Sequence, residues 1–298
     1  MPTKCPGIYC GRTAYENGSY SVCGACPRGS KPNEHSLCEA CHDSPSFYDW
    51  LYLGFMAVLS LLLHWFFIDF TNKRKSRALV VLHVSAVTES VLSAIITLLL
   101  ARPMGTLAVE SCSVNKLSDW YTMMYNPTPN YTTTLHCTQE IVYPLYTIVM
   151  VYYAFCLIFL MLVRPVISHM FMDGRGTKSI YAALYFLPIL VVIQAVFAGL
   201  LYYAFPYIVL VVSTITCAIH LAYFKEQNIK DILHDIVKSP RNLTILLGHW
   251  MLHAFGIVAV TELRDPGFHS LFIMLVPFPA LFYILTVRFT DPDHLDTV

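Results

Sequence analysis

Residues 50–101 read WLYLGFMAVLSLLLHWFFIDF, then TNKRKSR, then ALVVLHVSAVTESVLSAIITLLLA. Each outer segment is apolar and long enough to cross about 30 Å of hydrocarbon as a helix, which takes about 20 residues. The short segment between them carries Lys73, Arg74, Lys75 and Arg77. Because basic loops stay on the cytosolic side of a membrane, this segment predicts both membrane insertion and orientation.

The composition of the whole chain also indicates a membrane protein. Of its 298 residues, 56% are hydrophobic and only 13% are charged, and the mean hydropathy is +0.56. The formal net charge is zero, so nothing in it favours nucleic acid as a partner. Residues 1–46 lack the apolar run of a cleavable signal, so we expect the first membrane helix to direct insertion into the lipid bilayer.

Seven apolar segments are expected to span the membrane, giving an all-α polytopic protein. The run 179–224 is too long for one span, and Gly199, Tyr202, Tyr203 and Pro206 are its expected breakers. We expect a cysteine-rich module over 1–46, a membrane domain over 47–288 and an acidic tail over 289–298. The expected spans are 50–70, 78–101, 141–163, 179–200, 204–224, 243–261 and 269–287.

Loop charges predict a lumenal or outer N-terminus and a cytosolic C-terminus. The candidate glycosylation sites Asn17 and Asn130 fall on the predicted non-cytosolic side, whereas the Asn242 match falls at the cytosolic edge. The basic residues assigned to the cytosolic loops and tail are Lys73, Arg74, Lys75, Arg77, Arg164, Arg175, Lys178, Lys225, Lys230, Lys238, Arg241 and Arg288.

Cysteines are dense near the N-terminus, where apolar residues are too few to support a fold alone. We expect three disulfides among the six tail cysteines and a fourth joining Cys112 to Cys137. A zinc site on the two Cys-x-x-Cys pairs is the alternative if the tail is cytosolic. The disulfide candidates are Cys5, Cys10, Cys23, Cys26, Cys38, Cys41, Cys112 and Cys137.

Ionisable residues inside the predicted spans are candidates for function because they are costly in lipid. Glu89 needs a proton or a partner, and Ser90, Ser93 or a histidine are the candidates. His249 and His253 share one helix face, which permits an intramembrane zinc hydrolase as an alternative function. Its candidate metal ligands are His83, His220, His249 and His253. The preferred interpretation is packing by Glu89 and hydrogen bonding by neutral histidines, without a cofactor.

Two predicted cytosolic segments are suited to binding soluble partners. Residues 225–242 have apolar positions at helical spacing, which predicts a short amphipathic helix on the membrane surface. It either docks a soluble partner or is buried against lipid and the neighbouring spans. The C-terminal segment 290–298 is acidic. Its candidate partner-binding residues are Asp291, Asp293, Leu295, Asp296 and Val298. No catalytic motif is recognised, and a seven-span receptor is a further alternative.

Three features together resemble the c-Jun N-terminal kinase-associated membrane protein family: the opening MPTKCPGIYCGR of residues 1–12, the CGACP of residues 23–27, and the series of spans ending in DTV at 296–298. The resemblance covers essentially the whole chain. It implies a non-enzymatic adaptor of the endoplasmic reticulum membrane, acting in the degradation of misfolded proteins. It further implies three partners: the proteasome, membrane ubiquitin ligases and c-Jun N-terminal kinase, the kinase binding near the C-terminus.

Overall fold

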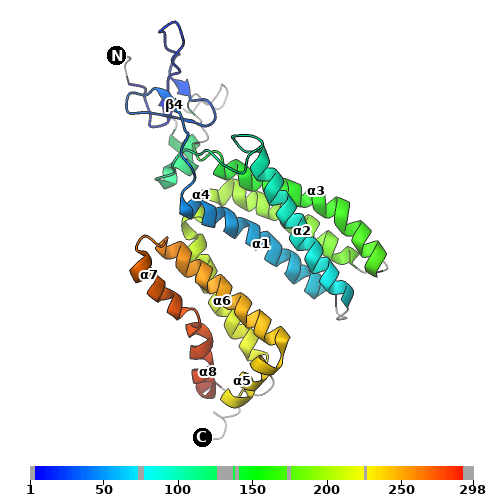
Figure 1. Cartoon of the computed structure of the whole chain (residues 1–298). Helices are drawn as coiled ribbons and strands as arrows, with labels where there is room; N and C mark the ends of the chain where they lie inside the picture. Colours follow the sequence, from blue (N-terminus) through cyan, green and yellow to red (C-terminus); the bar gives the residue numbers. More distant parts are fainter. Residues whose placement is uncertain are drawn as a thin grey trace. The chain divides into compact units, whose positions relative to one another are not determined.

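The computed structural model describes residues 4–72, 77–125, 137, 141–172, 176–224 and 227–290, with the backbone alone at 77, 78, 172 and 288–290. Two short antiparallel hairpins come first and helices follow (Figure 1). The hairpins pair β1 (Cys10–Gly11) with β2 (Gly24–Ala25), and β3 (Ser30–Pro32) with β4 (Cys38–Ala40). The chain divides into two compact units, Met1–Tyr202 and Tyr203–Val298.

Four disulfides cross-link the N-terminal module. A side chain on Gly11 would place its Cβ only 2.5 Å from Cys26 Sγ, so the hairpin packs directly on a disulfide in place of an apolar core. Two of the bonds lie inside the module and two tie it to the loop that follows α2. The pairs are Cys5–Cys23, Cys26–Cys38, Cys10–Cys137 and Cys41–Cys112. The expected Cys112–Cys137 bond, and the expectation of three bonds within the tail, are therefore wrong.

The two long-range disulfides constrain how the chain crosses the membrane. Cys10 and Cys41 precede the first two apolar helices, whereas Cys137 and Cys112 follow them. Bonded cysteines share one side of a membrane, so the module and this loop lie on the same side. Tyr9 adds a polar contact between them: its hydroxyl lies 2.6 Å from Ser118 Oγ and 2.9 Å from Asp119 Oδ1. Burial is the main cause that raises the Tyr9 pKa to about 12, so this phenol stays neutral.

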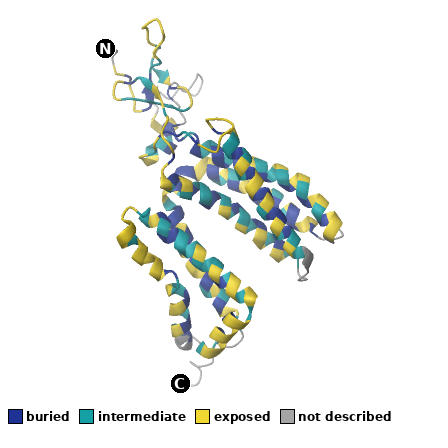
Figure 2. Ribbon diagram, in the orientation of Figure 1, coloured by how far each residue is buried: buried dark blue, intermediate teal, exposed yellow. Residues whose placement is uncertain are grey.

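Three apolar helices, α1 (Phe47–Thr71), α2 (Arg77–Leu100) and α3 (Leu145–Met172), form the bundle of the first unit (Figure 1). The N-terminal part of the next helix, α4 (Thr177–Ala222), belongs to the same unit and contacts α1 through Phe186 and Gln194. Ser46 and Asp49 form a capping box that fixes the start of α1. Short 3-10 helices η1 (Leu117–Trp120) and η2 (Thr122–Tyr125) lie between α2 and α3. Exposed residues follow the outer faces of the bundle (Figure 2), as expected for helices that contact lipid.

Helix α4 (Thr177–Ala222) passes unbroken through the residues expected to end it. Pro206 has no N–H to donate to the carbonyl of Tyr202, four residues earlier. The hydroxyl of Tyr48 donates to that carbonyl instead, at 2.7 Å, which offsets the missing bond. Gly199 is a packing position rather than a breaker, since a Cβ there would lie 2.6 Å from Trp120 Cβ.

The second unit contains the C-terminal half of α4 and the remaining helices. They are α5 (Ile229–Lys238), α6 (Pro240–Thr261), α7 (Pro266–Phe272), η3 (Ile273–Leu275) and α8 (Phe278–Thr290). Asp265 caps α7 by accepting a hydrogen bond from Phe268 N, and Pro266 begins the helix. The last expected span, 269–287, is therefore interrupted rather than a single helix.

Six stretches of the described residues are long and apolar enough to cross a membrane, rather than seven. The count differs because the two spans expected between 179 and 224 form the single helix α4. With several such helices the chain is a multi-pass membrane protein. The count of seven is not confirmed.

Candidate functional site

Glu89 of α2 lies in a buried polar cluster inside the first unit, with only 2% of its surface exposed. Its carboxylate accepts two hydrogen bonds from Arg164 of α3: Nε donates at 3.2 Å and Nη2 at 2.5 Å. The hydroxyl of Ser85 donates to Glu89 Oε1 at 2.6 Å. This bidentate geometry is the strongest form of arginine and carboxylate pairing.

The position expected for Arg164 from the sequence, in a cytosolic loop, is wrong. Helix α3 continues past the predicted end at 163 and through Pro165, so Arg164 lies inside it and is fully buried. The expected partners of Glu89 are also corrected. Ser93 donates to the backbone carbonyl of Glu89 rather than to its carboxylate, and Ser90 bonds to Tyr152.

His64 connects α1, the third helix of the bundle, to the pair formed by Glu89 and Arg164. Its Nδ1 lies 3.1 Å from Arg164 Nη1, so that nitrogen accepts the hydrogen bond and the imidazole is neutral. The ring also packs edge-on against Phe186 of α4, with centroids 4.9 Å apart. One guanidinium therefore contacts a carboxylate on α2 and an imidazole on α1.

A set of hydroxyls extends the buried polar contacts along the bundle. The Tyr152 hydroxyl of α3 lies 3.0 Å from Ser60 Oγ of α1 and 3.1 Å from Ser90 Oγ of α2. Polar contacts of this kind hold membrane helices together where the hydrophobic effect gives no preference. The cluster thus fixes the relative register of α1, α2 and α3, which supports a packing role for Glu89.

The histidines of α6 each meet a hydroxyl on α4, within the second unit. His253 Nδ1 lies 2.9 Å from Ser213 Oγ, and His249 Nδ1 lies 3.2 Å from Thr216 Oγ1. The rings of His220 and His249 are 6.0 Å apart between centroids. His83 belongs to the other unit, where its Nδ1 lies 2.8 Å from the carbonyl of Leu79.

These contacts do not assemble the metal site considered from the sequence. Over the described ranges, no group of three His, Cys, Asp or Glu side chains is placed to hold a metal ion. His249 and His253 instead form hydrogen bonds with hydroxyl groups, which is the role preferred for them from the sequence.

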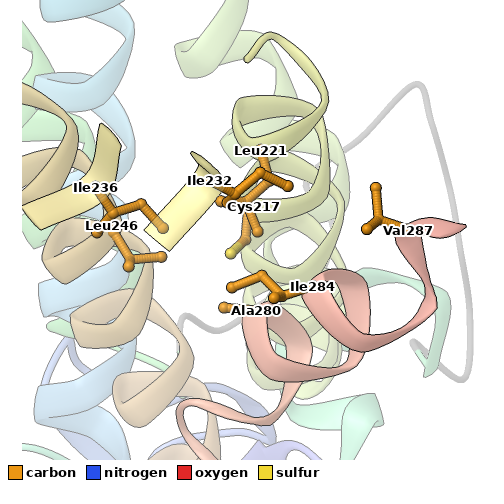
Figure 3. Packing of buried hydrophobic residues seen from close by; sticks show 8 residues of the cluster. All are labelled: Cys217, Leu221, Ile232, Ile236, Leu246, Ala280, Ile284 and Val287. Carbon is orange, nitrogen blue, oxygen red and sulfur yellow. The ribbon is translucent and has the colours of Figure 1, made fainter. Parts of the chain in front are cut away.

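Helix α5 confirms the amphipathic helix predicted within 225–242. Ile232 and Ile236 are buried against α4, α6 and α8 (Figure 3). Leu233 and Val237, by contrast, are 46% and 77% exposed. The buried cluster around α5 consists of Cys217, Leu221, Ile232, Ile236, Leu246, Ala280, Ile284 and Val287. We name the opposite side, with Lys230, Leu233, His234 and Val237, the α5 outer face. Packing therefore accounts for Ile229, Ile232 and Ile236 but not for the apolar side chains of Leu233 and Val237.

Comparison with known proteins bears on the whole of this architecture. The family model described as "JNK1/MAPK8-associated membrane protein" matches residues 5–292. The chain belongs to this family. A relative from Mus musculus is 52% identical over 300 residues, covering 98% of this chain and 95% of the relative. One from Homo sapiens is 50% identical with the same two coverages.

A more distant member of the family comes from Caenorhabditis elegans and is named a homolog of the same protein. It is 34% identical over 283 residues, covering 94% of this chain and 87% of its own length. No solved structure matches the chain. The match to all three relatives spans both compact units, so the family shares the module, the bundle and the second unit.

Several residues singled out from the sequence lie outside the described residues. They include Asn130 and the basic residues Lys73, Arg74 and Lys75, whereas Arg77 begins α2. The tail candidates Asp291, Asp293, Leu295, Asp296 and Val298 also lie outside them. Asn17 is described and exposed, in a turn where Ser19 Oγ donates to Asn17 Oδ1 at 2.6 Å.

Arg164 and His64 are the site residues whose roles sequence reasoning missed. Pro165 follows Arg164 directly, and the residue before a proline is usually outside a helix, so a loop was the natural expectation. One signal was available: Glu89 stands deep in an apolar segment and requires an opposite charge on another helix.

Proposed function

We propose that this protein is a non-enzymatic adaptor of the endoplasmic reticulum membrane that binds the kinase JNK1/MAPK8. It gathers proteasomes and membrane ubiquitin ligases where misfolded proteins are degraded. The proposal of the kinase as a partner rests on the family match over residues 5–292 together with the names of the relatives. The degradation role rests on the resemblance of the sequence alone.

Two segments are proposed to bind the soluble partners: the α5 outer face and the tail 289–298. Leu233 and Val237 are exposed beside charged residues, so a soluble partner that docks there buries two apolar side chains within a polar rim. The two segments follow α4 and α8, and α5 packs against α8 in the cluster of Figure 3. Two modest contacts on one unit raise overall affinity by avidity.

The first prediction concerns these two segments. Deleting Asp291–Val298 is expected to lower recovery of JNK1/MAPK8 with the full-length protein, and Leu233→Asp with Val237→Asp to lower recovery of at least one partner. Loss of one contact of a bivalent pair reduces overall binding by a factor on the order of 10². The measurement is quantitative affinity capture from stressed cells, with blots for the kinase, proteasome subunits and ubiquitin ligases.

A matched control introduces the same change in net charge at another position of α5. Lys238→Asp lowers the net charge by two, the same change as Leu233→Asp with Val237→Asp, and leaves the α5 outer face as it is. Equal protein levels by blot show that the variants fold. Undiminished kinase recovery after both the deletion and the Leu233 and Val237 changes would reject the proposed binding segments.

We further propose the membrane organisation in seven spans, with the module in the lumen. A helix of 46 residues is about 69 Å long, roughly twice the hydrocarbon thickness. Its apolar residues continue along its whole length, so a single crossing leaves about half of them in water. Two crossings by 179–200 and 204–224 avoid this cost, and they require α4, which is one unbroken helix in the structure, to turn near 201–203 in the bilayer.

The second prediction tests that organisation. Asn17→Gln is expected to remove one endoglycosidase-sensitive glycan, because Asn17 is exposed on the module. A glycosylation sequon appended after Val298 is expected to stay unmodified, since seven crossings place it in the cytosol. Modification of the appended sequon would show an even number of crossings and reject the seven-span organisation.

A further inference from the structure

A groove lies between α1, α2 and α3 at the end of the bundle nearest the disulfide-bonded module. Its volume is about 180 Å³, and the residues that shape it include Trp50, Gly54, Ala57, Ala94, Thr97 and Ile148. Glycine and alanine on facing helices leave the space open, because larger side chains there would fill it. An apolar cavity of about 150 Å³ holds a molecule the size of benzene.

Thr97 is the unusual residue of the lining. Its side chain is buried, with 3% of the residue exposed, and its hydroxyl has no hydrogen-bond partner among the described residues. Most threonines in helices donate to the carbonyl four residues earlier, as Thr88 of α2 does with Val84 at 3.0 Å. A buried hydroxyl without a partner costs free energy. An acceptor from outside the protein would remove that cost.

A second, smaller cavity of about 50 Å³ shares Thr97 and Ile148 with the groove. It is lined by Tyr143 and Pro144 rather than by α1. Thr97 and Ile148 therefore border both spaces. Each space is small, which suits a flexible acyl chain better than a rigid fused ring system.

The surroundings of the groove identify where an occupant comes from. Val91 and Ile95, on the same helix as Ala94, are 49% and 41% exposed in a span that faces lipid. Trp50 is 37% exposed at the groove, and tryptophan prefers the interface between hydrocarbon and headgroups. Thr97 is about 4.5 Å from the end of α2 at Leu100, close to that same interface.

We propose that the groove binds one acyl chain of a membrane glycerolipid, and that the ester carbonyl of this lipid accepts a hydrogen bond from Thr97. The apolar walls take the chain, and the Thr97 hydroxyl, which has no partner among the described residues, is at the depth where ester groups lie. This binding is independent of the kinase and of the adaptor role.

The third prediction tests the site in the full-length protein in cells. The probe is a photoactivatable, clickable fatty acid that cells incorporate into their phospholipids, and adducts are mapped to peptides by mass spectrometry. Wild-type protein is expected to carry adducts on the segments 50–57, 94–98 and 148–152. Ala94→Leu is expected to bring labelling of these segments to background, because leucine fills the groove. Thr97→Val is expected to lower it by about two- to tenfold, the effect of one net hydrogen bond.

Matched variants distinguish the groove from general contact with lipid. Val91→Leu changes a lipid-facing residue of α2, and Thr88→Val removes an exposed hydroxyl that already has a partner, so both are expected to label like the wild type. Wild-type labelling in Ala94→Leu, or as many adducts on the lipid-facing Val91 and Leu92 as on the segment 94–98, would overturn the proposal. Groove labelling by a photoactivatable sterol that displaces the fatty acid probe would also overturn it.

Discussion

Arg164→Ala is expected to destabilise the bundle of α1, α2 and α3 by about 3–5 kcal/mol, because it leaves the carboxylate of Glu89 buried without a counter-charge. His64 loses its hydrogen-bond donor in the same variant. The measurement is the thermal stability of purified protein in detergent, followed by size-exclusion chromatography, together with the half-life of the protein in cells. Glu89→Ala is expected to have a similar effect, since it isolates the guanidinium.

Two comparisons separate the effect of burial from that of charge. The double variant Glu89→Gln with Arg164→Gln removes both charges and is expected to be more stable than either alanine variant, as neutral partners avoid an isolated ion. Arg264→Ala breaks an exposed ion pair with Glu262, in which the arginine side chain is 76% exposed. It is expected to cost less than about 1 kcal/mol. If Arg164→Ala costs no more than Arg264→Ala, the cluster does not hold the bundle together.

Cys41→Ser is expected to have the second large effect, destabilising the module by about 2–4 kcal/mol. The bond closes 71 residues of chain onto Cys112. Full chain entropy overstates the loss, because α1 and α2 remain inserted and already restrict the loop between them. Limited proteolysis of the module in microsomes permeabilised with mild detergent measures the change, and a maleimide reagent detects the thiol freed at Cys112.

Cysteines that form no disulfide provide the control for Cys41→Ser. Cys156 and Cys217 are free and buried in helices, so serine at either position leaves the cross-links intact. Those variants are expected to keep the protease resistance of the module. A Cys41→Ser variant as resistant as Cys156→Ser would show that hydrogen bonds such as those of Tyr9 suffice to hold the module.

Apolar length and cysteine density were enough to predict a multi-pass helical protein with an oxidised module. They could not predict which cysteines pair, because the spacing of cysteines does not reveal which loops meet in space. Two of the disulfides join segments that are separated in sequence by two helices. The helix break at 199–206 was predicted from Gly199 and Pro206, yet a tyrosine distant in sequence replaces the missing donor. Such compensation depends on tertiary contacts that local sequence rules do not include.

The candidate site shows the same limit. Glu89 was recognised as a residue that needs a partner, but Arg164 was assigned to a loop because Pro165 follows it. For α5, periodicity predicted an amphipathic helix, while the division into buried Ile232 and exposed Leu233 depends on where α4, α6 and α8 pack.

The connectivity of the disulfides also sets an order of events during biosynthesis. The partner of Cys10 is synthesised 127 residues later in the chain, and the partner of Cys41 is synthesised 71 residues later. At about 5–20 residues per second, Cys10 remains unpaired or wrongly paired for roughly 6–25 seconds after its own synthesis. By then α1 and α2 have been translated, so native oxidation of the module reports that both helices have inserted and returned the loop to the compartment of the N-terminus.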